Sequence, residues 1–345
     1  MGDILNKKVV TFGEMMLRLI PPGHLRFVQA DSLNVTFGGG EANVAVSLAN
    51  YGIESYFVSQ LPANYLGRAA ANHLRRYGVD ISYLAWGGKR LGIYFSETGA
   101  SQRPSLVIYD RDNSAVTEIK PGSIDWESVF HGKHWFHFTG ITPALGASLA
   151  GVTHEAVRCA KEMGLTVSCD LNYREKLWTT EKSNEVMTGL VEYVDLLIAN
   201  EEDAEKVFGI KAGGSDIISG RLSDEGYTGV ARELYKNFNL QKVAITLRES
   251  HSASCNGWSA LLYDGQKIYK SKQYKVHLVD RVGGGDSFCG GLIYALLENY
   301  PPQRAVDFAV AASCLKQTIY GDFNHVSVAE VENLAGGDAS GRVQR

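Results

Sequence analysis

The chain has 345 residues and a formal charge of −4, because 38 Asp and Glu outnumber 34 Lys and Arg. With 45% hydrophobic and 21% charged residues, the composition argues against whole-chain disorder, and the mild acidity argues against nucleic acid as a partner. The length predicts about two domains. Glycine is the unusual component, since two triplets, Gly38–Gly40 and Gly283–Gly285, stand near the two ends of the chain.

The first eight residues and the cysteines indicate a cellular compartment. Residues 1–8 show no basic-then-apolar leader, and no apolar run approaches the roughly 20 residues that a membrane helix needs. The cysteines are odd in number and form no C-x-x-C pair, which argues against a disulfide framework or a zinc site. They are Cys159, Cys169, Cys255, Cys289 and Cys314. We therefore expect a cytoplasmic protein that does not bind membranes.

Apolar strand-like runs alternate with longer amphipathic stretches along most of the chain. Strands are predicted at 8–13, 55–59, 133–138, 165–169, 194–198 and 243–246. Helices are predicted at 41–51, 66–77, 145–163, 201–208 and 227–238. This alternation predicts an α/β fold, with a mostly parallel sheet that carries helices on both faces. The stretch 210–227, rich in Gly, Ser and Asp, is interpreted as a surface insertion.

Two segments interrupt the alternation and have no helical period. The segments 15–37 and 89–117 are expected to form a small sheet from non-contiguous pieces, which acts as a lid over the core formed by 1–14, 38–88 and 118–345. Within and beside the second segment, strands are predicted at 90–96, 104–109 and 115–119, with a hairpin loop at 99–102. The alternative is two long surface loops, but unstructured loops of this length are uncommon. An exposed lid sheet has edges to cover, so we expect subunits to pair through it.

The second glycine triplet predicts an anion site. Gly283–Gly285 and Asp286 precede an apolar helix body at 288–297, so free N–H groups and the positive end of the helix dipole meet there. The carboxylate of Asp286 could accept a proton from a hydroxyl that attacks a bound phosphate. The alternative is a simple turn with a helix cap. Neither G-x-x-x-x-G-K-[ST] nor G-x-G-x-x-G occurs, which disfavours P-loop and dinucleotide-binding folds.

Three motifs in order give a specific resemblance. The segment 280–288, D-R-V-G-G-G-D-S-F, resembles the D-T-x-G-A-G-D-x-F signature of the PfkB-type carbohydrate kinases. The segment 39–49, G-G-E-A-N followed by an Ala-rich helix, resembles the family's G-G-x-x-x-N motif, and 200–203 resembles its N-x-x-E motif. The resemblance spans residues 9–325. It implies the ribokinase-like fold, a three-layer α/β/α sandwich with a small β-sheet lid, and an ATP- and Mg²⁺-dependent sugar kinase.

The resemblance also implies roles for individual residues. Asp286 is the implied catalytic base, and the N–H groups of Gly283, Gly284 and Gly285 are the implied anion hole for the transferred phosphate. Nucleotide contacts are implied for Asn200, Thr246, Arg248, Gly283 and Gly285. Magnesium is implied to bind Asn200 and Asp203, mainly through water, although capping of the helix that follows explains this pair equally well. The chain departs from the family pattern where Arg281 replaces Thr, Gly284 replaces Ala, Arg248 replaces Gly, and Asp203 stands in the place of Glu in the N-x-x-E motif.

The acceptor is suggested by a closer resemblance to 2-keto-3-deoxygluconate kinases. It implies substrate contacts for Gly38, Gly39, Asn43, Tyr94, Tyr109, Arg111, Arg174, Asp286 and Asp322. Two arginines among them, Arg111 and Arg174, would bind the carboxylate of an open-chain sugar acid, unless both are ordinary solvated surface residues. The expected reaction is phosphorylation of the terminal hydroxyl of 2-keto-3-deoxygluconate. The alternatives are a kinase for 2-keto-3-deoxygalactonate, fructose or ribose, or a non-catalytic sensor on the same fold.

Overall fold

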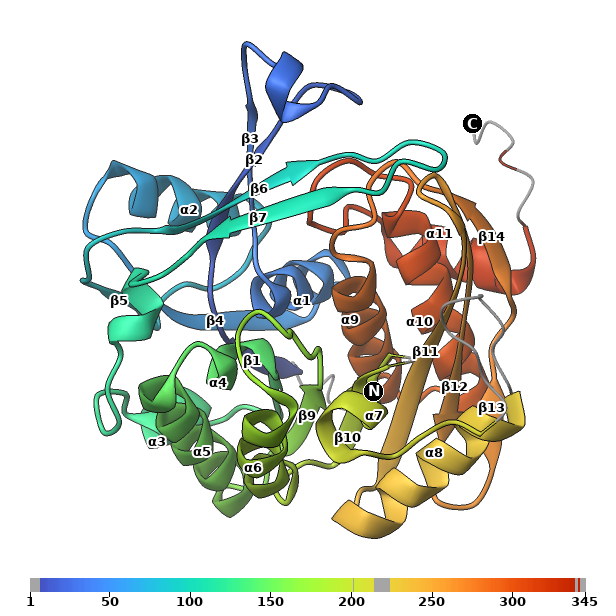
Figure 1. Ribbon diagram of the computed structural model, residues 1–345. Helices are drawn as coiled ribbons and strands as arrows, with labels where there is room; N and C mark the ends of the chain where they lie inside the picture. Colours follow the sequence, from blue (N-terminus) through green and yellow to red (C-terminus); the bar gives the residue numbers. More distant parts are fainter. Residues whose placement is uncertain (1–6, 201, 214–223, 339–340, 342–345) are drawn as a thin grey trace.

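The computed structural model describes residues 7–200, 202–213, 224–338 and 341 of the chain. Within these residues the larger sheet has ten strands: β1 (Lys8–Phe12), β4 (Glu54–Leu61), β5 (Leu84–Trp86), β8 (Trp135–Thr139), β9 (Thr166–Asp170), β10 (Leu196–Ala199), β11 (Lys242–Ser252), β12 (Cys255–Tyr263), β13 (Ile268–Lys270) and β14 (Tyr274–His277). Their order is β13-β12-β11-β10-β9-β8-β1-β4-β5, and β14 also pairs with β12 (Figure 1). All neighbours from β5 to β11 are parallel, whereas β12 is antiparallel to its partners. The predicted mostly parallel sheet is confirmed.

The parallel strands are nearly continuous apolar runs because helices cover both faces of the sheet. In β1 the side chains of Val9, Val10 and Phe12 are fully buried, and in β8 the same holds for Phe136 and Phe138. A few buried polar residues, such as Thr11, His137 and Ser168, lie inside these strands, whereas the polar residues that line the cavity lie mostly at or beyond the strand ends.

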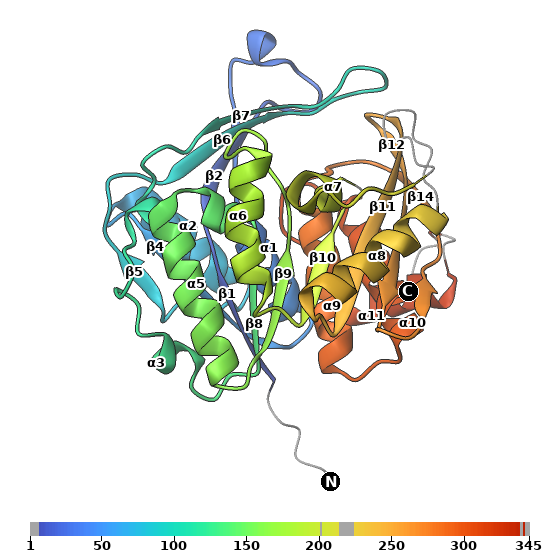
Figure 2. The ribbon, with the colours of Figure 1, turned by 60° about the horizontal axis from the view of Figure 1, so that its bottom comes forward.

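The helices follow the strands in chain order. Those of the described residues are α1 (Gly40–Asn50), α2 (Tyr65–Arg76), α3 (Trp126–Phe130), α4 (Ile141–Ala144), α5 (Ala147–Glu162), α6 (Thr180–Val191), α7 (Asp203–Phe208), α8 (Asp224–Phe238), α9 (Gly284–Leu297), α10 (Pro302–Lys316) and α11 (Val328–Gly336). One face of the sheet carries α5, α6 and α8, and the other carries α1, α9, α10 and α11 (Figure 2). The predicted strands and helices of the core are present with ends shifted by a few residues, although β11 continues to Ser252. The predicted insertion at 210–227 falls largely on 214–223, outside the described residues.

A separate small sheet forms the lid. Its strands are β2 (Met16–Ile20), β3 (Asn34–Gly38), β6 (Gly92–Glu97) and β7 (Leu106–Asp110), in the order β3-β2-β6-β7. Two segments far apart in sequence therefore build one sheet, as predicted, and Figure 2 shows it lying across one end of the core. The exposed side chains of Val35, Leu106 and Ile108 leave apolar surface on these strands. Pairing of subunits through the lid stays a prediction.

The strand predicted at 115–119 is wrong. Residues Ala115–Glu118 form a short 3-10 helix, η2, because local hydrogen bonds favour a turn there. The N–H and the hydroxyl of Thr117 both donate to the carbonyl of Ser114, at 2.9 and 2.7 Å. The hydroxyl of Ser114 donates to the buried carboxylate of Glu14, which holds this turn against the core.

The loop between β6 and β7 contacts the turn between β11 and β12 of the core. The N–H of Ala253, between β11 and β12, donates to the carbonyl of Ser101 at 2.8 Å, and the N–H of Ser101 donates to the hydroxyl of Ser254 at 3.0 Å.

A second 3-10 turn, η1 (Phe27–Gln29), lies in the connection between β2 and β3. Among the described residues, no helix has both the length and the apolar character needed to cross a membrane.

Candidate active site

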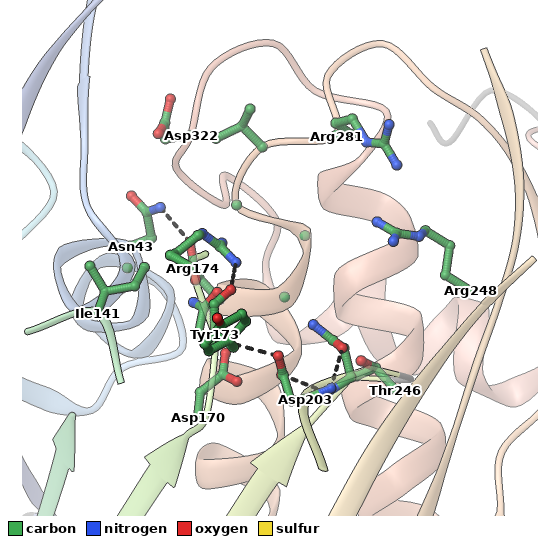
Figure 3. A pocket seen from close by; sticks show the side chains of 18 of the residues that line it. Asn43, Ile141, Asp170, Tyr173, Arg174, Asp203, Thr246, Arg248, Arg281 and Asp322 are labelled. Carbon is green, nitrogen blue, oxygen red and sulfur yellow. Dashed lines mark hydrogen bonds between the residues drawn. The ribbon is translucent and has the colours of Figure 1, made fainter. Parts of the chain in front are cut away.

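A cavity of about 520 Å³ lies where the carboxyl ends of β9 and β10 and the middle of β11 meet the start of α9, and Tyr94 of β6 and Tyr109 of β7 line it from the lid. Figure 3 shows part of its lining. Ligands of open α/β sheets bind at such carboxyl edges. Most of the residues predicted from the sequence line this cavity: Gly39, Asn43, Tyr94, Tyr109, Arg174, Asn200, Asp203, Thr246, Arg248, Gly283, Gly284, Gly285, Asp286 and Asp322. The lining does not include Gly38 or Arg111. The two departures from the family motifs that carry charge, Arg248 and Arg281, both line it.

The glycine turn before α9 is shaped to hold an anion against bare backbone. Gly283 has φ of +80°, and a Cβ built on it would lie 2.1 Å from the carbonyl oxygen of Asp322, so only glycine fits there. Helix α9 starts at Gly284, and its first N–H groups have no partner within the helix. These donors and the helix dipole together favour a phosphate at this end of the cavity.

Asp286 sits in the first turn of α9, is partly buried and lines the cavity. The side-chain amide of Asn43, in α1, donates to its Oδ2 at 2.6 Å (Figure 3). Burial raises the pKa of Asp286 from 3.8 to about 6, and the bond from Asn43 limits the rise. The nearby charge of Asp322 also raises the pKa, whereas Arg174 and Lys316 lower it. A carboxylate with a pKa near 6 is a competent proton acceptor at neutral pH.

Glu41 fixes α1 and therefore Asn43, and sequence analysis missed it. Its Oε1 accepts hydrogen bonds from the N–H and the hydroxyl of Thr139, at 3.0 and 2.9 Å, and from the hydroxyl of Thr142 at 2.7 Å. Burial raises the pKa of Glu41 to about 7. The sequence feature that could have identified Glu41 is its place as the single acidic residue in the first turn of α1. The α1 start also approaches the chain closely, since a Cβ on Gly39 would lie 1.9 Å from the carbonyl of Glu14.

Asp322 belongs to a buried cluster that joins the lid to the glycine turn. The guanidinium of Arg18, in β2, donates to Asp322 at 3.0 Å and to both oxygens of Asp280 at 2.7 and 3.2 Å. The hydroxyl of Tyr94, in β6, donates to Asp322 as well. Burial alone would lower the pKa of Arg18, but the carboxylates of Asp322 and Asp280 raise it, so the arginine stays charged. A Cβ at Gly38 would lie 2.1 Å from Asp322, which explains the glycine although it does not line the cavity.

Arg18 was not predicted as a site residue, and no local pattern marks it. It lies 262 residues from Asp280 in sequence and is the single charged residue of the otherwise apolar strand β2. Only the folded chain shows that its side chain points into the core.

Arg174 and Arg111, which sequence analysis treated alike, have different surroundings. Arg174 follows β9, lines the cavity and donates to the carbonyl of Tyr173 at 3.0 Å (Figure 3). In the described residues no carboxylate forms an ion pair with it, although its charge lowers the pKa of Asp286 and of Asp203. Arg111 is buried and its Nε donates to Glu14 at 2.9 Å. Its guanidinium lies 5.4 Å from the ring centre of Tyr109, which does line the cavity.

Asn200 and Asp203 serve as turn and helix caps while they line the cavity. Asn200 Oδ1 accepts the N–H groups of Glu202 and Asp203, at 2.8 and 3.1 Å, and the carboxylate of Asp203 accepts those of Asn200 and Tyr173, at 3.0 and 3.1 Å. No group of three or more acidic, His or Cys side chains suited to a metal is found in the described residues. The amide of Asn200 and the carboxylate of Asp203 both line the cavity and would suit Mg²⁺ held through water rather than by direct ligation.

Comparison with known proteins shows which proteins this chain resembles. Residues 6–325 match the model of the pfkB family carbohydrate kinases. A 2-dehydro-3-deoxygalactonokinase of Haloferax volcanii is 35% identical over 97% of this chain and 99% of its own length. The crystal structure of a 2-dehydro-3-deoxygluconokinase of Thermotoga maritima has a TM-score of 0.93 and 53% identity, over 96% of this chain and all of that one.

A more distant structure, an Escherichia coli protein in complex with ATP and Mg²⁺, has a TM-score of 0.79 over 96% of this chain and 99% of its own. Its 19% identity shows the fold alone. The ribokinase-like fold predicted from the three motifs is therefore confirmed. The chain belongs to the PfkB family of carbohydrate kinases and is a phosphotransferase with an alcohol group as acceptor.

Proposed function

We propose that the protein transfers the γ-phosphate of ATP to the terminal hydroxyl of 2-keto-3-deoxygluconate. One observation carries the proposal: a partly buried carboxylate, Asp286, lies beside the glycine turn of α9 and shares its cavity with the cation Arg174. The base and the anion site serve phosphoryl transfer, and the cation suits a sugar acid. The named activities of the two similar proteins, which both act on 2-dehydro-3-deoxy sugar acids, support this choice.

Asp286 would accept the proton of the sugar hydroxyl as its oxygen attacks phosphorus. The new bond joins that oxygen to the γ-phosphorus, the bond between the γ-phosphorus and the bridging oxygen breaks, and ADP leaves with the bonding electrons. Asn43 holds the carboxylate of Asp286 in place through its 2.6 Å hydrogen bond. The N–H groups of Gly284 and Gly285 would stabilise the charge that spreads over the transferring phosphoryl group.

The sugar would lie between the lid and α1. Arg174 would bind the carboxylate of the substrate through a charge-assisted hydrogen bond, for which no carboxylate of the described residues competes by an ion pair. Tyr94 and Tyr109 line the same cavity from the lid strands and would exclude water from the bound sugar. Asp322, which accepts a hydrogen bond from Arg18 and lines the cavity, would accept a further hydrogen bond from a substrate hydroxyl.

The nucleotide would occupy the part of the cavity near β11. Thr246 and Arg248 of that strand line it, as do Asn200 and Arg281. Two arginines at this side add positive charge where phosphates bind. Asn200 and Asp203 would hold Mg²⁺ through water, and the ion would supply positive charge that offsets the charge of the nucleotide phosphates.

A second candidate acceptor is 2-keto-3-deoxygalactonate, because the Haloferax relative acts on that epimer by name. The test is ADP release, measured in a coupled assay, with both keto-deoxy acids, fructose and ribose, each with and without Mg²⁺. We expect turnover that requires Mg²⁺ and one of the two acids, with the higher kcat/KM for the gluconate form. Turnover with neutral sugars alone would refute the sugar-acid assignment, and a preference for the galactonate epimer would replace the first candidate by the second.

A further inference from the structure

One buried cation stands behind the active site without an ion-pair partner. Lys316 is the last residue of α10, and its side chain is 0% exposed. Its ammonium donates to the carbonyl oxygens of Asp280 and Ile319, at 3.2 and 3.5 Å. No carboxylate of the described residues pairs with it. Burying an ammonium on two weak carbonyl contacts is costly, and an apolar side chain of the same length would cost less.

The end of α10 supports the glycine turn from behind. The Cε atom of Lys316 lies 3.3 Å from the position that a Cβ on Gly283 would take. The carbonyl of Gln317 accepts the N–H groups of Val279 and Asp280, at 2.9 and 3.2 Å. The hydroxyl of Ser313 donates to the carbonyl of Gly284 at 2.7 Å. Lys316 is therefore fixed against the same backbone that presents its N–H groups to the cavity.

The pKa of Lys316 is lowered from its ordinary value, and nearby carboxylates limit that change. Burial lowers its pKa, but Asp280, Asp322 and Asp286 oppose that effect, whereas Arg18 adds to it. Asp280 and Asp322 already share the guanidinium of Arg18, so they compensate the lysine only in part. The interaction between Lys316 and Asp286 is mutual, since the lysine lowers the pKa of that carboxyl. In a protein interior a charge acts over a longer range than in water, so a cation behind the turn attracts negative charge in front of it.

We propose that the ammonium of Lys316 is the built-in cation of the anion-binding turn, and that it stabilises the negative charge that develops on the phosphoryl group during transfer. This inference rests on the kinase function proposed above. Lys316 does not line the cavity, so it acts through the field and through the backbone of Asp280 and Gly283 rather than by contact. It is retained at a cost in stability, as functional charges often are.

The experiment compares three variants in the full chain. Lys316→Met removes the charge and keeps the length, whereas Lys316→Arg keeps the charge. The matched control is Lys161→Met, because Lys161 is also a partly buried lysine but forms an ion pair with Asp195, at 2.8 Å to both oxygens. Asp195 directly precedes β10, so this pair lies at the amino edge of the sheet, away from the cavity. For each variant, kcat, KM and the thermal midpoint are measured with the best acceptor of the sugar panel.

The proposal expects opposite effects on rate and on stability. Lys316→Met should lose about 10²-fold in kcat, comparable to loss of one oxyanion donor, while the sugar KM changes little. Its thermal midpoint should equal or exceed that of the wild type, whereas Lys161→Met should lower the midpoint and leave kcat unchanged. Lys316→Arg should recover at least about tenfold of the lost kcat.

Three results would overturn the role of Lys316: a kcat of Lys316→Met within about threefold of the wild type, a midpoint that falls as it does in the control, or an arginine variant no faster than the methionine variant. Failure of the wild type to use a sugar acid would refute the proposed substrate instead. The variants would then be compared on whichever sugar is turned over, so the two failures are distinguishable.

Discussion

Replacing Asp286 by Asn tests the proposed base and separates it from a merely structural residue. The substitution keeps the shape of the side chain, and the new amide oxygen can still accept the hydrogen bond from Asn43. It removes the proton acceptor. Because general-base catalysis contributes about 10²- to 10⁴-fold, we expect kcat to fall by that factor while the KM for both substrates changes little.

The same substitution should stabilise the fold, with a magnitude that follows from the burial of Asp286. Raising its pKa from 3.8 to about 6 costs the ionised form about 3 kcal/mol relative to the unfolded chain. Below pH 3.8 the carboxyl is protonated in both states and carries no cost, and above pH 6 it is ionised in both and carries the full cost. Asp286→Asn should therefore be more stable than the wild type at pH 8, by up to about 3 kcal/mol, and equally stable near pH 4.

The assay is thermal unfolding of both proteins at pH 4, 6 and 8, beside steady-state kinetics at pH 8. A stabilisation of this size would raise the midpoint at pH 8 by at least about 2 °C. Near-normal kcat in the variant would remove Asp286 as the base. A midpoint lowered at every pH would show that the carboxylate is needed for folding, and would refute the reasoning from its burial.

Further predictions follow from the surroundings of individual site residues. The kcat/KM of the wild type should fall on the acid side of about pH 6, because Asp286 must be ionised to accept a proton; a profile flat down to pH 5 would contradict this. Arg174→Ala should raise the KM for a sugar acid about 10²-fold. Arg111→Ala should instead lower the thermal midpoint, because it removes the ion-pair partner of Glu14. If both variants raised the KM for a sugar acid equally, both arginines would bind the carboxylate. Gly283→Ala should destabilise the fold by more than about 1 kcal/mol in denaturant unfolding, because of its positive φ and the close carbonyl of Asp322.

The parts of the molecule that could be predicted from sequence are those that depend on local periodicity. Apolar runs such as Val9–Phe12 and Leu196–Ala199 predicted the core strands, because a strand covered on both faces must be apolar along its whole length. Glycines at Gly38 and Gly283 were informative for a related reason, since each sits where another atom leaves no room for a Cβ. The turn at Ala115 was not predictable in the same way, because Glu14 holds it from 100 residues away.

The buried charged residues of the site could not be predicted from the sequence. Arg18, Glu41 and Lys316 are almost completely buried, but their side chains are of types that usually face solvent. Arg18 and Glu41 are stabilised by partners distant in sequence, such as Asp280 for Arg18 and Thr139 for Glu41, and no local pattern specifies such a partner. Sequence analysis could therefore identify the family of the site but not the network that supports it.

The distribution of cation partners decides which arginine can bind a sugar acid. Arg18 is committed to Asp280 and Asp322, and Arg111 to Glu14, so a substrate carboxylate would have to displace a protein carboxylate from either one. Arg174 has only the carbonyl of Tyr173 and the more distant field of buried aspartates, so it gains most from an added anion. An ion pair already made within the protein weakens the attraction of an arginine for a new anionic ligand. We therefore expect Arg174 to bind the substrate carboxylate and Arg111 to support the lid.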